Sequence, residues 1–187
     1  MRILKSHLRA TLKERYAVIN FQAYEKDLTN NALQYLSTKQ YSSIGVFCSL
    51  SHEQPTNKLI QELLRNDKKV FLPRMYGNDI KFHQIISTEE LVENRFKILE
   101  PPLHSKISDD LDVVIVPGLV FDRSGYRLGF GKGCYDKYLS KSNAIKVGYC
   151  ISLQLTADND LIPKESHDVA LDAIVTDVEI LEINGQS

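Results

Sequence analysis

The stretch "LDVVIVPGLVFDRSGYRLGFGKGCYDKYL", residues 111–139, holds both the strongest strand pattern in the sequence and its most unusual loop. Seven of the twelve residues from 111 to 122 are Val, Ile or Leu, which is typical of a strand buried on both faces of a parallel sheet. Four of the chain's nine glycines follow within residues 125–133, and the segment from Cys134 onward predicts a helix. A buried strand that leads through a glycine loop into a helix indicates an α/β fold, in which ligands bind at the carboxyl ends of the strands.

Helical and strand patterns alternate along the rest of the chain. Leu4, Leu8, Leu12 and Tyr16 recur at four-residue steps and predict an amphipathic first helix, and a second helical pattern covers residues 24–36. Further strands are predicted at residues 43–50, 69–75, 80–85, 144–150 and 171–183, and a further helix at 58–67. This alternation predicts a single domain over residues 1–187, a three-layer α/β sandwich of the Rossmann-like type with a mostly parallel central sheet flanked by helices.

The composition excludes several classes of protein. A net charge of −1 lacks the basic surplus that supplies most of the affinity for nucleic acids. Cys48, Cys134 and Cys150 are odd in number and form no C-x-x-C pair, which argues against a disulfide framework and a zinc site. No run approaches the ~20 apolar residues of a spanning helix, and the first sixteen residues lack the apolar core of a signal peptide. We therefore expect a reduced, cytoplasmic protein without nucleic-acid or membrane partners, and a monomer because no long exposed apolar stripe is evident.

The alternating glycines at positions 129, 131 and 133 favour an anion site. Glycine lets backbone N–H groups approach a phosphate closely and reaches positive φ easily, and a helix amino terminus follows. Arg127 and Lys132 add positive charge, and Asp136, one helical turn beyond Lys132, is suited to Mg²⁺. Two familiar templates fail, because the P-loop needs other residues at 126 and 133 and the dinucleotide fingerprint needs glycine at 134. The alternative is a mobile turn that only joins strand to helix.

Residues 114–139 resemble the signature of the 5-formyltetrahydrofolate cyclo-ligases, roughly P-G-x-x-F-D-x-x-G-x-R-L-G-x-G-x-G-Y-Y-D. Other segments are similar to pieces of that family in the same order: "KSHLR" (5–9), "FCSLSHEQPT" (47–56), "LPRM" (72–75) and "HDVALDAIVTD" (167–177). Two positions depart from the pattern. Cys134 stands where the family usually has the first of two tyrosines, and Met75 stands where some members have an aromatic residue.

The resemblance implies that ATP and 5-formyltetrahydrofolate, with or without further glutamyl residues, give 5,10-methenyltetrahydrofolate, ADP and phosphate, with Mg²⁺ as the metal. The predicted topology is related to that of the phosphosugar isomerases and CoA transferases. The residues implied as ATP-binding are Lys5, Arg9, Arg127, Leu128, Gly129, Phe130, Gly131, Lys132, Gly133, Cys134 and Tyr135. Those implied as substrate-binding are Cys48, Glu53, Phe130, Gly131, Lys132, Gly133 and Cys134, with catalytic roles for Lys132, Arg127 and Glu53 and metal ligation by Asp136 and Asp172.

Most of these assignments have a structural alternative. Lys5 and Arg9 share one face of the first helix, which would be its solvated side. Glu53 would instead cap the helix that follows it, and Asp172 would end a strand as a turn residue. No pair of histidines has metal-ligand spacing, and His52 is the best histidine candidate only because it adjoins Glu53. The alternative functions are a non-catalytic nucleotide- or folate-binding protein, and a phosphosugar isomerase or acyl-CoA transferase.

Overall fold

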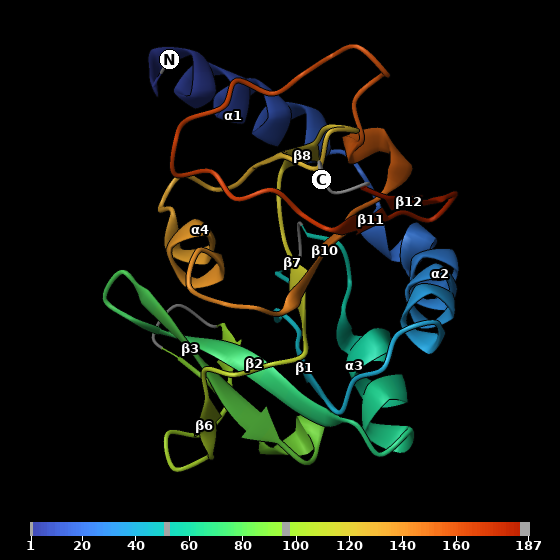
Figure 1. Ribbon diagram of the computed structural model, residues 1–187, viewed down its shortest axis with the longest axis vertical. Helices are drawn as coiled ribbons and strands as arrows, with labels where there is room; N and C mark the ends of the chain where they lie inside the picture. The colour runs from blue at the N-terminus through green and yellow to red at the C-terminus, as the bar shows by residue number, and fades with distance from the viewer. Residues whose placement is uncertain (1, 51–52, 95–97, 184–187) are drawn as a thin grey trace.

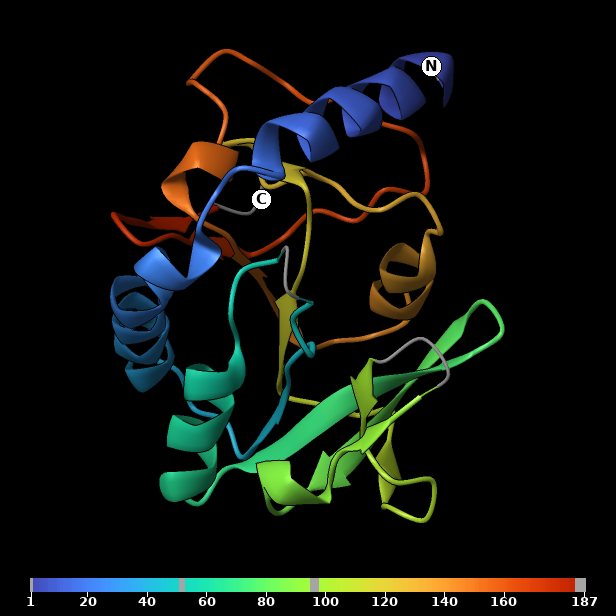
Figure 2. The ribbon, with the colours of Figure 1, turned by 180° about the vertical axis from the view of Figure 1, so that it is seen from behind.

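An eight-stranded mixed sheet runs through the molecule (Figures 1 and 2). The computed structural model describes residues 2–50, 53–94 and 98–183. In their order across the sheet the strands are β12 (Ile180–Glu182), β11 (Ala173–Val175), β10 (Ile145–Tyr149), β7 (Val113–Val116), β1 (Ser43–Gly45), β2 (Lys69–Tyr76), β3 (Asp79–Ile85) and β6 (Ile107–Ser108). The five strands from β11 to β2 pair in parallel. At one edge β12 pairs antiparallel with β11; at the other edge β3 pairs antiparallel with β2, and β6 pairs antiparallel with β3. The expected α/β fold with a largely parallel sheet is confirmed.

β7 forms the centre of the sheet because its side chains are apolar on both faces. All four of its residues are fully buried, and the strand pairs in parallel with β10 on one side and with β1 on the other. The strand ends at Val116, directly before Pro117, whose nitrogen has no hydrogen to donate to a neighbouring strand. The strand predicted over residues 111–122 is therefore too long. The chain leaves the sheet and enters a separate ribbon of β8 (Val120–Phe121) and β9 (Arg127–Leu128).

Helices cover the two faces of the sheet unequally (Figure 1). α2 (Glu25–Ser37) and α3 (Asn57–Arg65) lie on one face, where Leu28, Ala32 and Leu36 repeat every four residues and are buried. α4 (Cys134–Leu139) lies on the other face and has only six residues. Connecting segments, with Leu155 and Val169, also pack there. The shorter elements are η1 (Phe21–Tyr24), η2 (Thr88–Glu90), η3 (Ser152–Gln154) and a ribbon of β4 (Val92–Glu93) and β5 (Leu99–Glu100).

α1 (Arg2–Tyr16) lies across the end of the molecule at which β7 finishes (Figures 1 and 2). Leu12 and Tyr16 enter the core, whereas Leu4 is 56% exposed. The predicted apolar stripe is therefore confirmed from Leu8 onward, because Leu8 also packs against the core. The first half projects over the carboxyl ends of the strands, where Lys5 and Arg9 meet the glycine segment and the loop before β11.

The glycine segment follows the β8–β9 ribbon instead of following β7 directly. The turn of this ribbon is held by Asp122, a fully buried residue whose carboxylate accepts hydrogen bonds from the backbone amides of Ser124 (3.0 Å), Tyr126 (3.1 Å) and Ile162 (2.9 Å). A buried charge is tolerated only with such partners. The turn fixes the start of β9 and so the position of Arg127, its first residue.

Apolar side chains form one core cluster on each face of the sheet. Val113 and Ile115 belong to the first cluster and Val114 and Val116 to the second, because successive side chains of a strand point to opposite faces. Within the described residues, no helix is long and apolar enough to cross a membrane. A single domain over residues 1–187 and the relation to phosphosugar isomerases and CoA transferases remain predictions.

Candidate active site

A cavity of about 890 Å³ opens at the carboxyl ends of the parallel strands. Its walls come from α1, the loop after β1, the β2–β3 hairpin, the glycine segment and the loop that precedes β11. The lining residues are Lys5, Ser6, Arg9, Leu50, Glu53, Met75, Ile80, Pro117, all ten residues from Arg127 to Asp136, Glu165, His167 and Asp168. The structure thus brings nearly all of the predicted site residues together; Cys48 and Asp172 are the exceptions.

The backbone of the glycine segment is shaped for close approach. Gly131 has φ +102° and Gly133 has φ +66°, in the region that favours glycine. The Nε of Arg9 donates a hydrogen bond to the carbonyl oxygen of Gly129 over 2.8 Å. A methyl group on residue 131 would lie 3.3 Å from guanidinium atoms of Arg9. Glycine at 131 therefore lets the first helix close onto the segment.

Lys132 and Phe130 project from the same segment. Both are exposed and both line the cavity. Among the residues that the structure describes, the ammonium of Lys132 has no hydrogen-bond or ion-pair partner. The one cation at the tip of the segment is thus available to an anionic ligand.

Arg127 and Asp136 form a pair in the wall of the cavity. Arg127 is 7% exposed, and its Nη2 lies 3.1 Å from Oδ1 of Asp136. The same oxygen accepts a hydrogen bond from the backbone amide of Val169 over 3.1 Å. The Nε of Arg127 is buried and has no hydrogen-bond partner within the described part of the chain. A buried donor without a partner is uncommon and points to a ligand in this wall.

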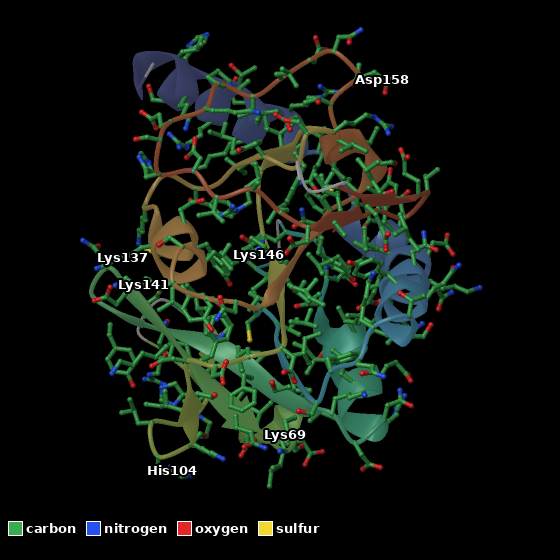
Figure 3. The ribbon with its side chains drawn as sticks, in the orientation of Figure 1. Lys69, His104, Lys137, Lys141, Lys146 and Asp158 are labelled. Carbon is green, nitrogen blue, oxygen red and sulfur yellow. The ribbon has the colours of Figure 1, made fainter. Side chains whose placement is uncertain are left out.

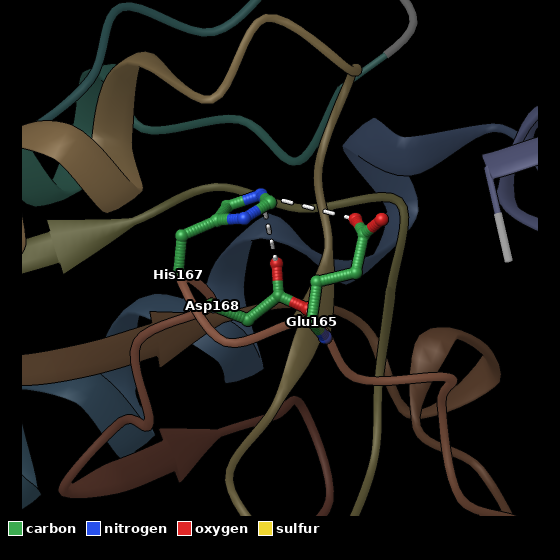
Figure 4. Close-up of side chains that lie close together, drawn as sticks. All are labelled: Glu165, His167 and Asp168. Carbon is green, nitrogen blue, oxygen red and sulfur yellow. Dashed lines mark hydrogen bonds and ion pairs between the residues drawn. The ribbon is translucent and has the colours of Figure 1, made fainter.

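An acidic cluster that the sequence analysis missed also lines the cavity (Figure 4). The ammonium of Lys5 lies 2.6 Å from Oδ2 of Asp168 and 3.0 Å from Oε2 of Glu165. The Nε2 of His167 lies 3.8 Å from Glu165 and 3.9 Å from Asp168. Ligand atoms of Glu165, His167 and Asp168 all lie within 4.8 Å of one another, a spacing that fits a metal ion.

The charges in this cluster stabilise one another. Burial alone would lower the pKa of Lys5, but its hydrogen bonds to Asp168 and Glu165 outweigh burial and raise the pKa. Burial alone would raise the pKa of Asp168, but the hydrogen bonds from Lys5 and from the amide of Glu165, with the charges of Lys5 and His167, together outweigh burial and lower the pKa. The pKa of Glu165 is lowered chiefly by its hydrogen bond from Lys5. Lys5 is thus charged, only 4% exposed and already paired, which contradicts the alternative of a solvated lysine.

Asp172 lies elsewhere. It immediately precedes β11, at the amino-terminal end of the parallel strands, which is the opposite edge of the sheet. Its Oδ2 accepts a hydrogen bond from the backbone amide of Lys146 over 2.7 Å, and it lines a separate, open hollow with Lys146 (labelled in Figure 3) and Glu182. The structure therefore does not join Asp172 to Asp136 in one metal site, and the turn role is the better description. Within the same predicted segment, Asp168 is the acid that reaches the cavity.

On the β1 side of the cavity, Glu53 is placed as expected. Its Oε2 accepts a hydrogen bond from the amide of Leu50 over 2.9 Å, so the carboxylate organises its own loop. The N-cap of α3 is Thr56, which rules out Glu53 as the cap. Cys48 is partly buried against the core and does not line the cavity; burial, with the charges of Glu100 and Glu53, raises the pKa of its thiol to about 12.

Four further residues remain to be placed. The hydroxyl of Tyr135 is buried without a hydrogen-bond partner in the described residues, and burial, followed by the charge of Glu53, raises its pKa. Cys134 and Cys150 are buried free thiols, as expected of packing residues, and Cys134 also lines the cavity. His52 lies outside the described residues.

Comparison with known proteins identifies one family. The model of the 5-formyltetrahydrofolate cyclo-ligase family matches residues 2–177. A protein of Escherichia coli K12 described as 5-formyltetrahydrofolate cyclo-ligase is 32% identical over 189 residues, which cover 96% of this chain and 100% of that protein.

Two solved structures have a fold similar to that of this chain. The NMR structure of the Aquifex aeolicus 5,10-methenyltetrahydrofolate synthetase superposes with a TM-score of 0.81 at 29% identity and covers 98% of this chain and 95% of that one. A 5,10-methenyltetrahydrofolate synthetase of Mycoplasma pneumoniae has the same fold, with a TM-score of 0.73 at 21% identity over 92% of this chain and 98% of that one.

Proposed function

This chain belongs to the 5-formyltetrahydrofolate cyclo-ligase family and is an enzyme of that family, and we propose that it converts 5-formyltetrahydrofolate and ATP into 5,10-methenyltetrahydrofolate, ADP and phosphate. Family membership sets aside a non-catalytic binding protein, a phosphosugar isomerase and an acyl-CoA transferase. The observation that carries the proposal is the glycine segment in the wall of a cavity that also contains Glu53. At the tip of this segment, Lys132 has no ion-pair partner among the residues that the structure describes.

The cavity is lined by two chemically different groups of residues, which fit the two substrates. Lys132, Arg9 and the backbone from Gly129 to Gly133 supply cations and N–H groups, which suit a triphosphate. Leu50, Met75, Ile80 and Tyr135 supply apolar and aromatic surface, which suits a pterin ring. The two substrates would meet near Lys132.

The reaction explains why ATP is needed. The oxygen of a formamide is a poor leaving group, so it must be converted into a phosphate before the ring can close. The formyl oxygen attacks the γ-phosphorus and ADP leaves, which gives an iminium phosphate at N5. N10 then attacks the formyl carbon, the C–O bond breaks, phosphate leaves, and N10 loses its proton. The protein contributes positioning and charge, and no nucleophile of its own.

Each cation of the site has its own role. Lys132 is the exposed cation that would follow the γ-phosphate during transfer, and Arg9 would contact the phosphates while it holds the segment through Gly129. Arg127 would offer its unpartnered Nε to the bound nucleotide from the wall. Lys5 is committed to Asp168 and Glu165, so it would act on ATP by fixing those acids.

The residues present also fit the magnesium ion that the family implies. Mg²⁺ prefers carboxylate and phosphate oxygens, and Asp168 and Asp136 supply carboxylates in the cavity wall beside the glycine segment. The Asp136 carboxylate bonds to the amide of Val169, the residue next to Asp168, so the two acids are held close together. We propose that Asp136 and Asp168, and not Asp172, hold the ion. When bound, the ion would neutralise charge on the transferring phosphate.

Glu53 and Tyr135 would orient the folate. Both residues line the cavity, and the hydroxyl of Tyr135 lacks a hydrogen-bond partner among the described residues. They would hydrogen-bond to the pterin or the formyl group. Cys134 and Phe130 would contact the substrate, and Cys48 would support this wall from behind.

The test is a direct assay. Purified protein is mixed with Mg²⁺, ATP and 5-formyltetrahydrofolate, and the ultraviolet absorbance of the methenyl product is followed. Product should form only when both substrates are present. Absence of product from a folded protein would contradict the proposal. A cytoplasmic location, a monomeric state and acceptance of folates with longer glutamyl tails remain part of the proposal.

A further inference from the structure

Two buried glutamine side chains lie beside the cavity without lining it. Gln54 is 1% exposed and directly follows Glu53, and Gln154 is 2% exposed and ends η3, the short turn after β10. Burial of a carboxamide is unfavourable unless its polar groups are paired. Their pairing therefore identifies what these residues hold in place.

The carboxamide of Gln154 uses its full hydrogen-bonding capacity. Its Nε2 donates to the carbonyl oxygens of Gly118 (3.3 Å) and Leu119 (3.2 Å). Its Oε1 accepts from the Nε2 of Gln54 (2.5 Å) and from the backbone amide of Ile151 (3.1 Å). One side chain thus joins the segments that follow β1, β7 and β10, and a fully paired buried network of this kind favours a single arrangement.

From this pair, hydrogen bonds continue to the glycine segment. The amide of Leu119 donates to the carbonyl oxygen of Leu128 over 2.8 Å, and Leu128 directly precedes Gly129. On the other side, Gln54 is adjacent to Glu53, whose carboxylate is bonded to Leu50 in the same loop. The loop that carries Glu53 and the ribbon that carries the glycine segment are therefore tied together through Gln154.

We propose that the Gln54–Gln154 pair is a positioning unit that sets the separation between Glu53 on the folate side and the glycine segment on the phosphate side. This inference rests on the proposed function. Phosphoryl transfer depends on the alignment of the two reactants, and a misplacement of about 1 Å costs on the order of 100-fold in rate. The pair contacts no substrate and acts through Glu53.

The test is a double-mutant cycle on turnover. Gln54→Leu removes the bond to Gln154 and keeps the size of the side chain, and we expect kcat to fall about tenfold while the KM for ATP changes less than about twofold. In the Glu53→Gln background, the same change should lower kcat by less than about twofold, because the group that it positions is already lost. A purely structural role would make the two losses multiply, and that result would overturn the proposal.

Two controls keep the test decisive. Thr29→Val also replaces a fully buried polar group by an apolar one of equal size, in α2, and should leave kcat unchanged. If Gln54→Leu does not fold, Gln54→Glu retains the shape and, when ionised, cannot donate to Gln154; the same cycle with that variant decides the question. If the losses in kcat of Gln54→Glu and Glu53→Gln multiply in that cycle, the positioning role is refuted.

Failure of the proposed function gives a different result. A wild-type protein without ATP-dependent methenyl formation would refute the function itself. An active wild type in which Gln54→Leu has wild-type kcat, or in which ATP binding by calorimetry weakens together with kcat, would refute only the positioning unit.

Discussion

The ammonium nitrogen of Lys5 lies 2.6 Å from Oδ2 of Asp168, 163 residues further along the chain. This contact joins the first helix to the loop before β11 and closes one side of the cavity. It also selects Asp168 as the acid of the "HDVALD" segment that belongs to the site, because Asp172 lies at the other edge of the sheet.

Asp168→Asn and Asp172→Asn therefore form a matched pair. Asp168→Asn should lower kcat by about 100-fold and raise the Mg²⁺ concentration needed for half-maximal rate. The substitution removes a ligand oxygen and also the negative charge that pairs with Lys5. Asp172→Asn should stay within about twofold of wild type, since it changes an exposed group outside the cavity. Rates measured over a magnesium titration check both, and equal losses would refute the assignment of the metal acids.

Lys132→Ala should act mainly on ATP. Removal of a charge-assisted bond to phosphate costs about 1.5–3 kcal/mol, so the KM for ATP should rise about tenfold to 100-fold. Lys141→Ala is the control, because this exposed lysine lies just after α4 and does not line the cavity (Figure 3). Steady-state kinetics at varied ATP concentration measure both variants. An unaltered KM for ATP in Lys132→Ala would show that Lys132 does not bind the phosphates.

Gly131→Ala and Gly77→Ala separate backbone strain from binding. Both glycines have positive φ, so each substitution should cost about 1–2 kcal/mol of unfolding free energy. Only residue 131 also faces the guanidinium of Arg9, whereas nothing lies within 4 Å of a methyl group at residue 77. Calorimetry should accordingly show weaker ATP binding for Gly131→Ala alone, and equal ATP affinities would contradict the close approach of Arg9.

Asp112 should make the fold sensitive to acid. Its Oδ2 accepts hydrogen bonds from the amides of Ser42 and Ser43, each at 2.8 Å, and these bonds lower its pKa to about 2. Because the unfolded pKa is about 3.9, the carboxylate stabilises the native state above that pH, and the contribution is lost as pH falls from about 4 to about 2.

Urea unfolding at a series of pH values measures this effect. Asp112→Asn should be less stable than wild type at pH 7, and the difference should shrink towards pH 2. Asp110→Asn alters an exposed carboxylate nearby whose side chain has no hydrogen bond among the described residues, and should follow the wild-type curve. A stability difference for Asp112→Asn that does not depend on pH would contradict the role of these bonds.

Local patterns in the sequence predicted most of the elements. The buried run at Val113–Val116 and the four-residue repeat of α2 depend on neighbours in the chain, and the structure confirms them. Pro117 ended a strand that hydrophobicity alone extended too far. Proline at position 117 marks this end of the strand in the sequence, because its nitrogen cannot donate a hydrogen bond to a neighbouring strand.

Contacts between distant segments were not predictable in the same way. Whether an acid near residue 170 lies at the amino-terminal or the carboxyl-terminal edge of the sheet depends on where β11 begins, and no periodicity marks that residue. Likewise, only the packing of α1 over the strand ends makes Asp168 a partner of Lys5. The resemblance indicates the segment, and the geometry is needed to show that Asp168 is its acid that lines the cavity.

The measurement that tests the central claim most directly is a crystal structure with Mg²⁺ and a non-hydrolysable ATP analogue. The triphosphate should lie against the backbone of Gly129–Gly133 with Lys132 at its γ end and Asp168 on the metal side. A triphosphate bound in any other part of the molecule, with the glycine backbone in contact with solvent, would contradict the assignment of this cavity as the active site.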